Sequence, residues 1–244
     1  MPVLIAVLLL AVGMAQAAPS KAEAFAPLFE LAGIRLLCEQ SEPLLRRGLS
    51  AQQQAQLGQV FAAEGLCRDL AEQLAGRFEP RQLRQARRLL ESPLARRFTA
   101  AERSVGEDGG TALADYRRQL AARAPLPSRL ALVRRLDAAA RTTALAALLR
   151  YEVGKTQALL ALRARGETLD EQALSRQTSV QAEALRQSSA AAVESFMLYA
   201  YRQIPSEQLA EYAALYEQPV LSRLLEESVQ ALPRLFAARR AAFR

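Results

Sequence analysis

Few residues of this chain have side chains that could carry out nucleophilic or acid–base chemistry. The sequence of 244 residues contains no histidine, which excludes Ser-His-Asp and Cys-His catalytic arrangements and histidine-ligated metal sites. Lys155 with Ser188 or Ser189 could form a Ser-Lys dyad, but nothing in their spacing requires one. We therefore expect a solvated lysine, and we predict neither a metal site nor a cofactor.

Glu91 and Glu217 are a second pair with chemical potential, because each stands two residues before a proline in similar surroundings. Two carboxylates can share acid and base roles if they converge in a cleft. The alternative, which we prefer, is that each glutamate pairs with a nearby arginine. The sequence thus favours a protein without enzymatic activity.

Aromatic residues gather in one short stretch that contains four of the six tyrosines of the chain. The cluster consists of Phe196, Tyr199, Tyr201, Tyr212 and Tyr216. A ring-lined pocket for an apolar or glycan ligand is the functional interpretation. Packing in a protein core is the more common use of such residues and remains the alternative.

Cys38 and Cys67 are the only cysteines. The midpoint between them falls on a turn near residues 48–51, which separates two predicted helices, Ile34–Leu49 and Gln52–Ala75. Residues equidistant from the turn lie level in an antiparallel helical hairpin. We therefore predict a disulfide that contributes about 3–4 kcal/mol; two buried thiols are the alternative. A redox pair is excluded because there is no Cys-x-x-Cys.

The amino-terminal residues predict export. Val3–Val12 is an apolar run with the length of a signal-peptide core, and Ala15-Gln16-Ala17 matches the small-x-small cleavage pattern. We predict a signal peptide of residues 1–17, cleaved after Ala17 or Ala18; an uncleaved membrane anchor is the alternative. The expected location is the periplasm, where disulfides form.

Basic residues exceed acidic ones, and the formal net charge is +7. Only Lys21 and Lys155 of the 32 basic residues are lysines, which, with the many alanines, indicates a GC-rich genome that favours arginine and alanine codons. The basic excess is therefore weaker evidence for an anionic partner than its size suggests. We do not expect a nucleic acid partner, because exported proteins rarely meet one.

The carboxyl-terminal segment is basic and contains two phenylalanines. Its residues of interest are Arg234, Phe236, Arg239, Arg240, Phe243 and Arg244. As an amphipathic helix it would suit an anionic membrane surface. The alternative is a final helix whose arginines complement the helix dipole.

Helical periodicity extends along almost the whole chain, and apolar residues never alternate over the length of a strand. Further predicted helices are Thr142–Arg165, Leu169–Arg202, Ser206–Glu217 and Val220–Ala238. The pattern predicts an all-α helical bundle without a sheet. Breaks at Gly106–Gly110 and Pro125–Pro127 divide the chain into an amino-terminal half (18–105), a linker region with one short helix (106–127) and a carboxyl-terminal half (128–244).

The two halves contain similar segments. Leu83–Phe98 aligns without gaps with Leu209–Leu224, and both contain Glu-x-Pro at the same offset. In each, a helix would end at Glu-x and proline would open the next helix, where its missing N–H costs nothing. We predict an internal duplication; chance similarity between two helical segments is the alternative.

Tyr201–Leu209, the following Leu215–Pro219 segment and the Leu28–Gly33 segment resemble a bacterial exported family catalogued as domain of unknown function 2059. The chain departs from the family pattern at Leu94 and Val220, where a glycine is expected. The resemblance implies an all-helical periplasmic protein without an assigned activity, and no catalytic residue can be transferred from it.

Three functions remain open at this stage. The first is a non-enzymatic binding or interaction protein whose partner is a protein or another envelope component. The second is a carrier of a lipid or other apolar ligand, and the third is an enzyme of the cell envelope. A carrier needs an enclosed apolar cavity of several hundred Å³, whereas an interaction protein needs an exposed apolar patch. The sequence does not indicate an oligomeric state.

Overall fold

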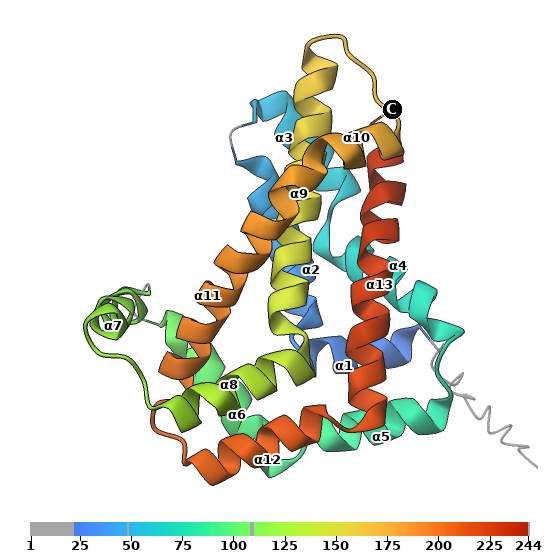
Figure 1. Ribbon diagram of the computed structural model, residues 1–244. Coiled ribbons are helices and arrows are strands. Elements are labelled where there is room, and N and C mark those ends of the chain that lie inside the picture. The colour runs from blue at the N-terminus through green and yellow to red at the C-terminus, as the bar shows by residue number, and fades with distance from the viewer. Residues whose placement is uncertain (1–21, 48, 108–109, 244) are drawn as a thin grey trace, which may run out of the picture.

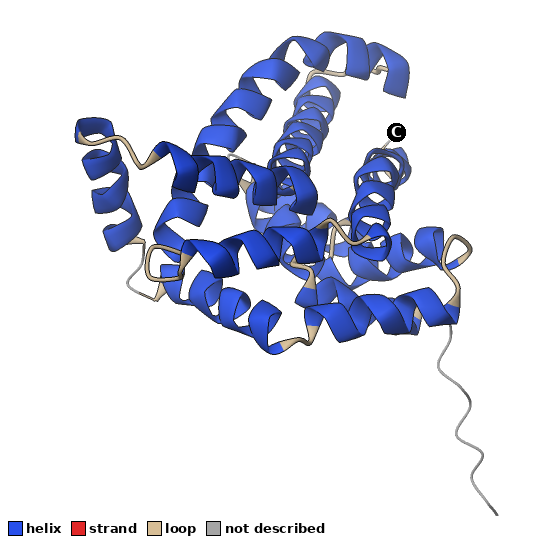
Figure 2. Ribbon diagram, turned by 60° about the horizontal axis from the view of Figure 1, so that its bottom comes forward, coloured by secondary structure: helices blue, strands red, loops and turns tan. Residues whose placement is uncertain are grey.

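The computed structural model describes residues 22–47, 49–107 and 110–243. Within these ranges the secondary structure is entirely helical, which confirms the predicted all-α class (Figures 1 and 2). The α-helices are α1 (Ala26–Leu31), α2 (Ile34–Arg46), α3 (Ala51–Val60), α4 (Ala63–Ala75), α5 (Pro80–Leu90), α6 (Pro93–Arg103), α7 (Thr111–Ala122), α8 (Pro127–Ala140), α9 (Thr142–Ala164), α10 (Glu171–Thr178), α11 (Ala182–Ala200), α12 (Ser206–Tyr216) and α13 (Pro219–Ala241). None of these helices combines the length and apolar character that a membrane crossing requires. The predicted signal peptide, residues 1–17, lies outside the described residues.

Prolines and polar caps set the helix starts. Pro80, Pro93, Pro127 and Pro219 each stand at the first turn of a helix, where no intrahelical partner is lost.

The predicted helix Gln52–Ala75 is wrong as one element, because the chain breaks between α3 and α4. The break lets Phe61 become fully buried. Its ring lies 5.5 Å from that of Phe236, between centroids, so a tertiary contact overrides the local helical pattern.

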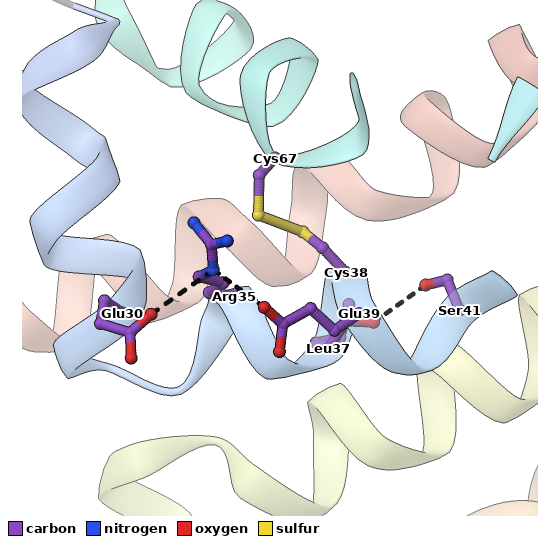
Figure 3. Close-up of a disulfide and its surroundings, with 7 residues drawn as sticks. All are labelled: Glu30, Arg35, Leu37, Cys38, Glu39, Ser41 and Cys67. Atoms are coloured by element: carbon purple, nitrogen blue, oxygen red, sulfur yellow. Dashed lines mark hydrogen bonds and ion pairs between the residues drawn. A yellow bond between two sulfur atoms is a disulfide. The ribbon is translucent and has the colours of Figure 1, made fainter. Parts of the chain in front are cut away.

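The disulfide between Cys38 and Cys67 joins α2 to α4 and confirms the predicted pairing (Figure 3). The Cα atoms are 6.0 Å apart, within the range that a disulfide spans. Cys38 is buried and Cys67 is half-buried. The bridge therefore holds the two helices that flank α3 in fixed register.

One hydrophobic core contains residues from both predicted halves. Helix α2 packs against α9, and α13 packs against α4 and α5 as well as α9. Helix α7, from the predicted linker region, lies at the edge of the molecule against α11 and buries no residue completely (Figure 1). The halves are thus interleaved in space rather than set side by side.

The carboxyl-terminal helix is an internal element, which corrects the membrane-surface interpretation. Phe236 and Phe243 are buried, with ring centroids 5.5 Å and 6.3 Å from that of Phe61. Arg240 is completely buried, and Arg239 donates to the Val60 carbonyl at 2.6 Å. These side chains are occupied inside the protein and cannot meet a membrane in this fold. Arg234 is exposed, and Arg244 lies outside the described residues.

Candidate ligand pocket

A pocket of about 660 Å³ lies between the α1–α2 corner and helices α6, α8, α9, α11 and α12. This volume is typical of small-molecule sites. Its apolar wall is formed by Leu37, Leu136, Leu145, Leu149, Phe196 and Met197. The pocket exists because seven helices converge on it from both halves of the chain, and it could not be located from any one segment.

Four of the five aromatic residues singled out from the sequence line this pocket: Phe196, Tyr201, Tyr212 and Tyr216. Tyr199 does not. Its ring lies 5.4 Å from that of Tyr116 on α7, and the Arg202 guanidinium lies 3.9 Å from its ring centroid. Tyr199 is thus directed to the other side of α11, where it helps to attach α7.

Among the polar side chains of the lining, one carboxyl group and three phenols lie together, and we call them the Glu102–tyrosine cluster (Glu102, Tyr201, Tyr212 and Tyr216). The Tyr201 hydroxyl donates to Glu102 Oε1 at 2.5 Å. The hydroxyls of Tyr212 and Tyr216 are 3.4 Å apart. Behind them, Phe98 stacks on Tyr212 with ring centroids 4.0 Å apart. The cluster is therefore held by core packing and by hydrogen bonds among its own members.

Burial controls the protonation of this cluster. It raises the pKa of Glu102, although the hydrogen bond from Tyr201 and the charge of Arg103 act in the opposite direction. Burial, with a smaller effect of Glu102, raises the pKa of Tyr216 to about 12. The pKa values of Tyr201 and Tyr212 are raised well above their ordinary value by the same cause. The phenols are therefore protonated at neutral pH.

Sequence reasoning missed Glu102. A signal for it exists, because Ala95, Phe98 and Glu102 follow the spacing of one helix face, and the first two are buried. An acidic residue that continues a buried stripe is unusual. The stripe shows that Glu102 faces inward, but it does not show which groups lie opposite, since Tyr201 is 99 residues away in the sequence.

Charged side chains surround the open side of the pocket. Arg35 Nε lies 2.9 Å from Glu39 Oε1 and 3.5 Å from Glu30 Oε2 (Figure 3). Arg103 Nη2 lies 3.3 Å from Glu30 Oε1. All four side chains are about half exposed or more, which identifies this rim as the side from which solvent enters. The rim arginines are thus already paired with rim glutamates.

A second polar cluster is enclosed by α9, α10 and α13; we call it the Arg240 cluster (Glu152, Lys155, Glu171 and Arg240). Arg240 Nη2 lies 2.6 Å from Glu171 Oε1 and 2.7 Å from Glu152 Oε2. The second contact is ionic rather than a well-aligned hydrogen bond. Lys155 Nζ lies 2.6 Å from Glu171 Oε1. Two acidic and two basic side chains therefore balance one another within the fold.

The Arg240 cluster corrects the prediction of a solvated lysine, because Lys155 is only 6% exposed. Its ammonium donates to Ser175 at 2.5 Å, whereas Ser188 and Ser189 accept from Arg150 at 2.8 Å and 3.1 Å. The proposed partners of Lys155 are thus occupied elsewhere. Lys155 serves as a cation in an ion pair with Glu171.

The two carboxylates of the Arg240 cluster have opposite pKa shifts. Burial raises the pKa of Glu152 and outweighs the attraction of Arg240. Burial acts in the same direction on Glu171, but hydrogen bonds from Arg240 and Lys155, together with their charges, outweigh it and lower the pKa to about 2. Glu171 is therefore the firmly ionised partner of both cations.

Glu91 and Glu217 are each paired with an arginine. Arg87 donates to Glu91 at 2.8 Å within α5. Arg135 on α8 donates to both oxygens of Glu217 at 2.7 Å. These ion pairs agree with the interpretation preferred from the sequence, in which the glutamates stabilise helices.

Comparison of the chain with protein-family models, with curated proteins and with solved structures yields no match.

Proposed function

We propose that this protein is an exported, non-enzymatic binding protein that holds a small, largely apolar ligand in the pocket between α2, α6, α8, α9, α11 and α12. One observation carries the proposal: a pocket of about 660 Å³ has a largely apolar wall and a group of convergent polar side chains, the Glu102–tyrosine cluster. Apolar walls supply affinity, and a few placed polar groups supply orientation and specificity. The Glu102–tyrosine cluster has this second role.

The surface of the protein favours a ligand over a macromolecular partner. Among the described residues, the large apolar side chains that are exposed are Leu36, Leu126 and Val180. They belong to α2, the loop before α8 and the turn between α10 and α11, so they are separate in the sequence and belong to different elements. Leu36 also lines the pocket, and three such side chains are too few to form the large contiguous apolar patch that indicates an interaction surface.

Two features support export. The pattern of residues 1–17 is that of a signal peptide, and the Cys38–Cys67 disulfide needs an oxidising compartment to persist. The resemblance to the family catalogued as domain of unknown function 2059 points to the same location. These features support the proposal that the protein is periplasmic.

An internal duplication would explain how the pocket arose. Leu83 and Leu209 are both buried, as are Phe98 and its counterpart Leu224. At two buried positions between them, Ala86 and Leu90 correspond to Tyr212 and Tyr216. We infer that the second copy gained tyrosines at core positions, and that these rings supply part of the polar lining of the pocket.

The proposal is tested by filling the pocket. Ala146 lines it from α9, so Ala146→Phe should weaken binding of the neutral fluorescent probe N-phenyl-1-naphthylamine by at least about tenfold. Ala184→Phe on the exposed face of α11 is the matched control, and circular dichroism checks that each variant folds. Thr142→Phe, also in the pocket lining, is the second variant. Equal probe binding by the pocket variants and the wild type would contradict the proposal.

A further inference from the structure

The Glu102 carboxyl is an acidic group in a confined site without a cationic partner. In the described part of the chain its polar partner is the Tyr201 hydroxyl, bonded to Oε1, and no lysine or arginine makes a salt bridge with it. Glu152, by contrast, has a carboxylate oxygen 2.7 Å from Arg240. Glu102 is half-buried, and the partial removal of its carboxylate from water disfavours the charged form and raises its pKa.

The three phenol rings beside Glu102 meet at nearly right angles. The planes of Tyr201 and Tyr212 are 77° apart, with centroids separated by 6.4 Å. The planes of Tyr212 and Tyr216 are 88° apart, with centroids separated by 5.1 Å. Each pair is a direct edge-to-face contact, and the side chains of Tyr201, Tyr212 and Tyr216 are 1%, 2% and 7% exposed. Tyr216 is the most exposed of the three, so its ring is the one best placed to meet a ligand, and an aromatic ring attracts cations through its negative face.

The charge of the pocket lining has the opposite sign to that of the whole protein. The charged residues that line the pocket are Glu30, Arg35, Glu39, Glu102 and Arg103. These three glutamates and two arginines give a net charge of −1 when all are ionised, on a chain whose formal net charge is +7. The arginines are held by rim glutamates, so the uncompensated charge is that of Glu102.

We propose that the ligand is an organic ammonium ion with an apolar body, and that the Glu102–tyrosine cluster binds its cationic head. This inference rests on the proposed function, because it assigns the ligand class of the same pocket. The carboxylate of Glu102 supplies the counter-charge, and the ring of Tyr216 supplies a cation–π contact. The body of the ligand lies against the apolar wall, which includes Leu145, Leu149 and Met197. An anionic ligand would be repelled by Glu102.

Three hexyl compounds of different charge test this inference by isothermal titration calorimetry. We expect the wild type to bind hexyltrimethylammonium about tenfold more tightly than neutral N-hexylacetamide. Hexanoate should bind most weakly of the three. Equal affinities for the cation and the neutral amide would overturn the assignment of an ammonium ligand while leaving the proposed function intact. If none of the three compounds binds and N-phenyl-1-naphthylamine does not bind either, both the assignment of an ammonium ligand and the proposed function are contradicted.

Variants of the cluster separate charge from ring contacts. Glu102→Gln keeps the shape of the side chain and should lower the affinity for hexyltrimethylammonium about tenfold, with N-hexylacetamide unchanged within about twofold. Glu226→Gln, an exposed position on α13, makes the same change in net charge and should have no effect. Tyr216→Phe should retain cation binding, whereas Tyr216→Leu should weaken it severalfold. Unchanged cation binding by Glu102→Gln would contradict the proposal.

Discussion

The Glu102–tyrosine cluster and the Arg240 cluster both place ionisable groups inside the protein, but they are built differently. In the Arg240 cluster two glutamates face an arginine and a lysine, so each charge has an opposite charge within 3 Å. In the Glu102–tyrosine cluster one carboxyl faces three neutral phenols and a pocket of about 660 Å³. We infer from this difference that the Arg240 cluster, whose charges balance one another, stabilises the fold. The Glu102–tyrosine cluster, which has an unbalanced charge beside a pocket, is suited to bind a ligand.

The largest effect on stability is expected from removing Arg240, the central cation of the Arg240 cluster. Arg240→Met leaves Glu152, which is only 2% exposed, without its counter-charge. Loss of one partner from a buried ion pair costs about 3–5 kcal/mol, so we expect a large drop in the free energy of unfolding measured in urea. Arg234→Met, at an exposed position of the same helix, should change it by less than about 0.5 kcal/mol. Similar stabilities for the two variants would mean that the Arg240 cluster is not structural.

A smaller and pH-dependent effect is expected from Glu171. Its pKa of about 2 in the folded protein is below the value of about 4.3 for an unfolded glutamate. Ionised Glu171 therefore stabilises the fold above about pH 4.3, and this contribution is lost as the pH falls towards 2. Glu171→Gln should cost roughly 2 kcal/mol at pH 7 and almost nothing near pH 2.

Urea unfolding as a function of pH measures this difference. Glu167→Gln is the control, because Glu167 forms an exposed pair with Arg165, and exposed pairs contribute little. If Glu171→Gln lowers the free energy of unfolding by the same amount at every pH, the ion pairs of Glu171 do not account for its contribution to stability.

Glu102 should have the smallest effect on the free energy of unfolding, and the pH dependence of this effect should be opposite to that of Glu171. Its pKa is raised by burial, so the folded protein holds this proton more tightly than the unfolded chain does. Wild-type stability then falls, relative to Glu102→Gln, as the pH rises through the pKa of the folded state. We expect Glu102→Gln to be as stable as the wild type at pH 4 and equal or slightly more stable at pH 8, by thermal unfolding in the absence of ligand. A marked loss of stability at pH 8 would place Glu102 among the structural residues.

Local patterns in the sequence predict local features of this fold. Helical periodicity and the even spacing of Cys38 and Cys67 about a turn predict the all-α class and the disulfide, because both depend on neighbouring residues. Four pocket aromatics could be found since they lie close together in the chain. Glu102 could not be joined to them, because its hydrogen-bond partner is 99 residues away.

Tertiary burial accounts for the predictions that failed. An amphipathic basic helix looks the same whether its apolar face meets a membrane or a protein core, so Phe236 and Arg240 were consistent with either setting. The deciding residue, Glu171, is 69 positions from Arg240. Lys155 was misjudged for a similar reason, because its partners Glu171 and Ser175 belong to α10, whose packing against α9 has no signal in the sequence.

The position of α13 has a consequence for the order in which the chain acquires its structure. This last helix contacts α4, α5, α8, α9 and α12, and Arg239 donates to a carbonyl group 179 residues earlier. The cysteines, with a sequence separation of 29, can meet early, whereas contacts as distant as those of α13 form late, because long stretches of chain must first be brought together. A chain without α13 would expose the apolar surfaces of the helices that α13 covers, so we expect the fold to become stable only after α13 has packed against them.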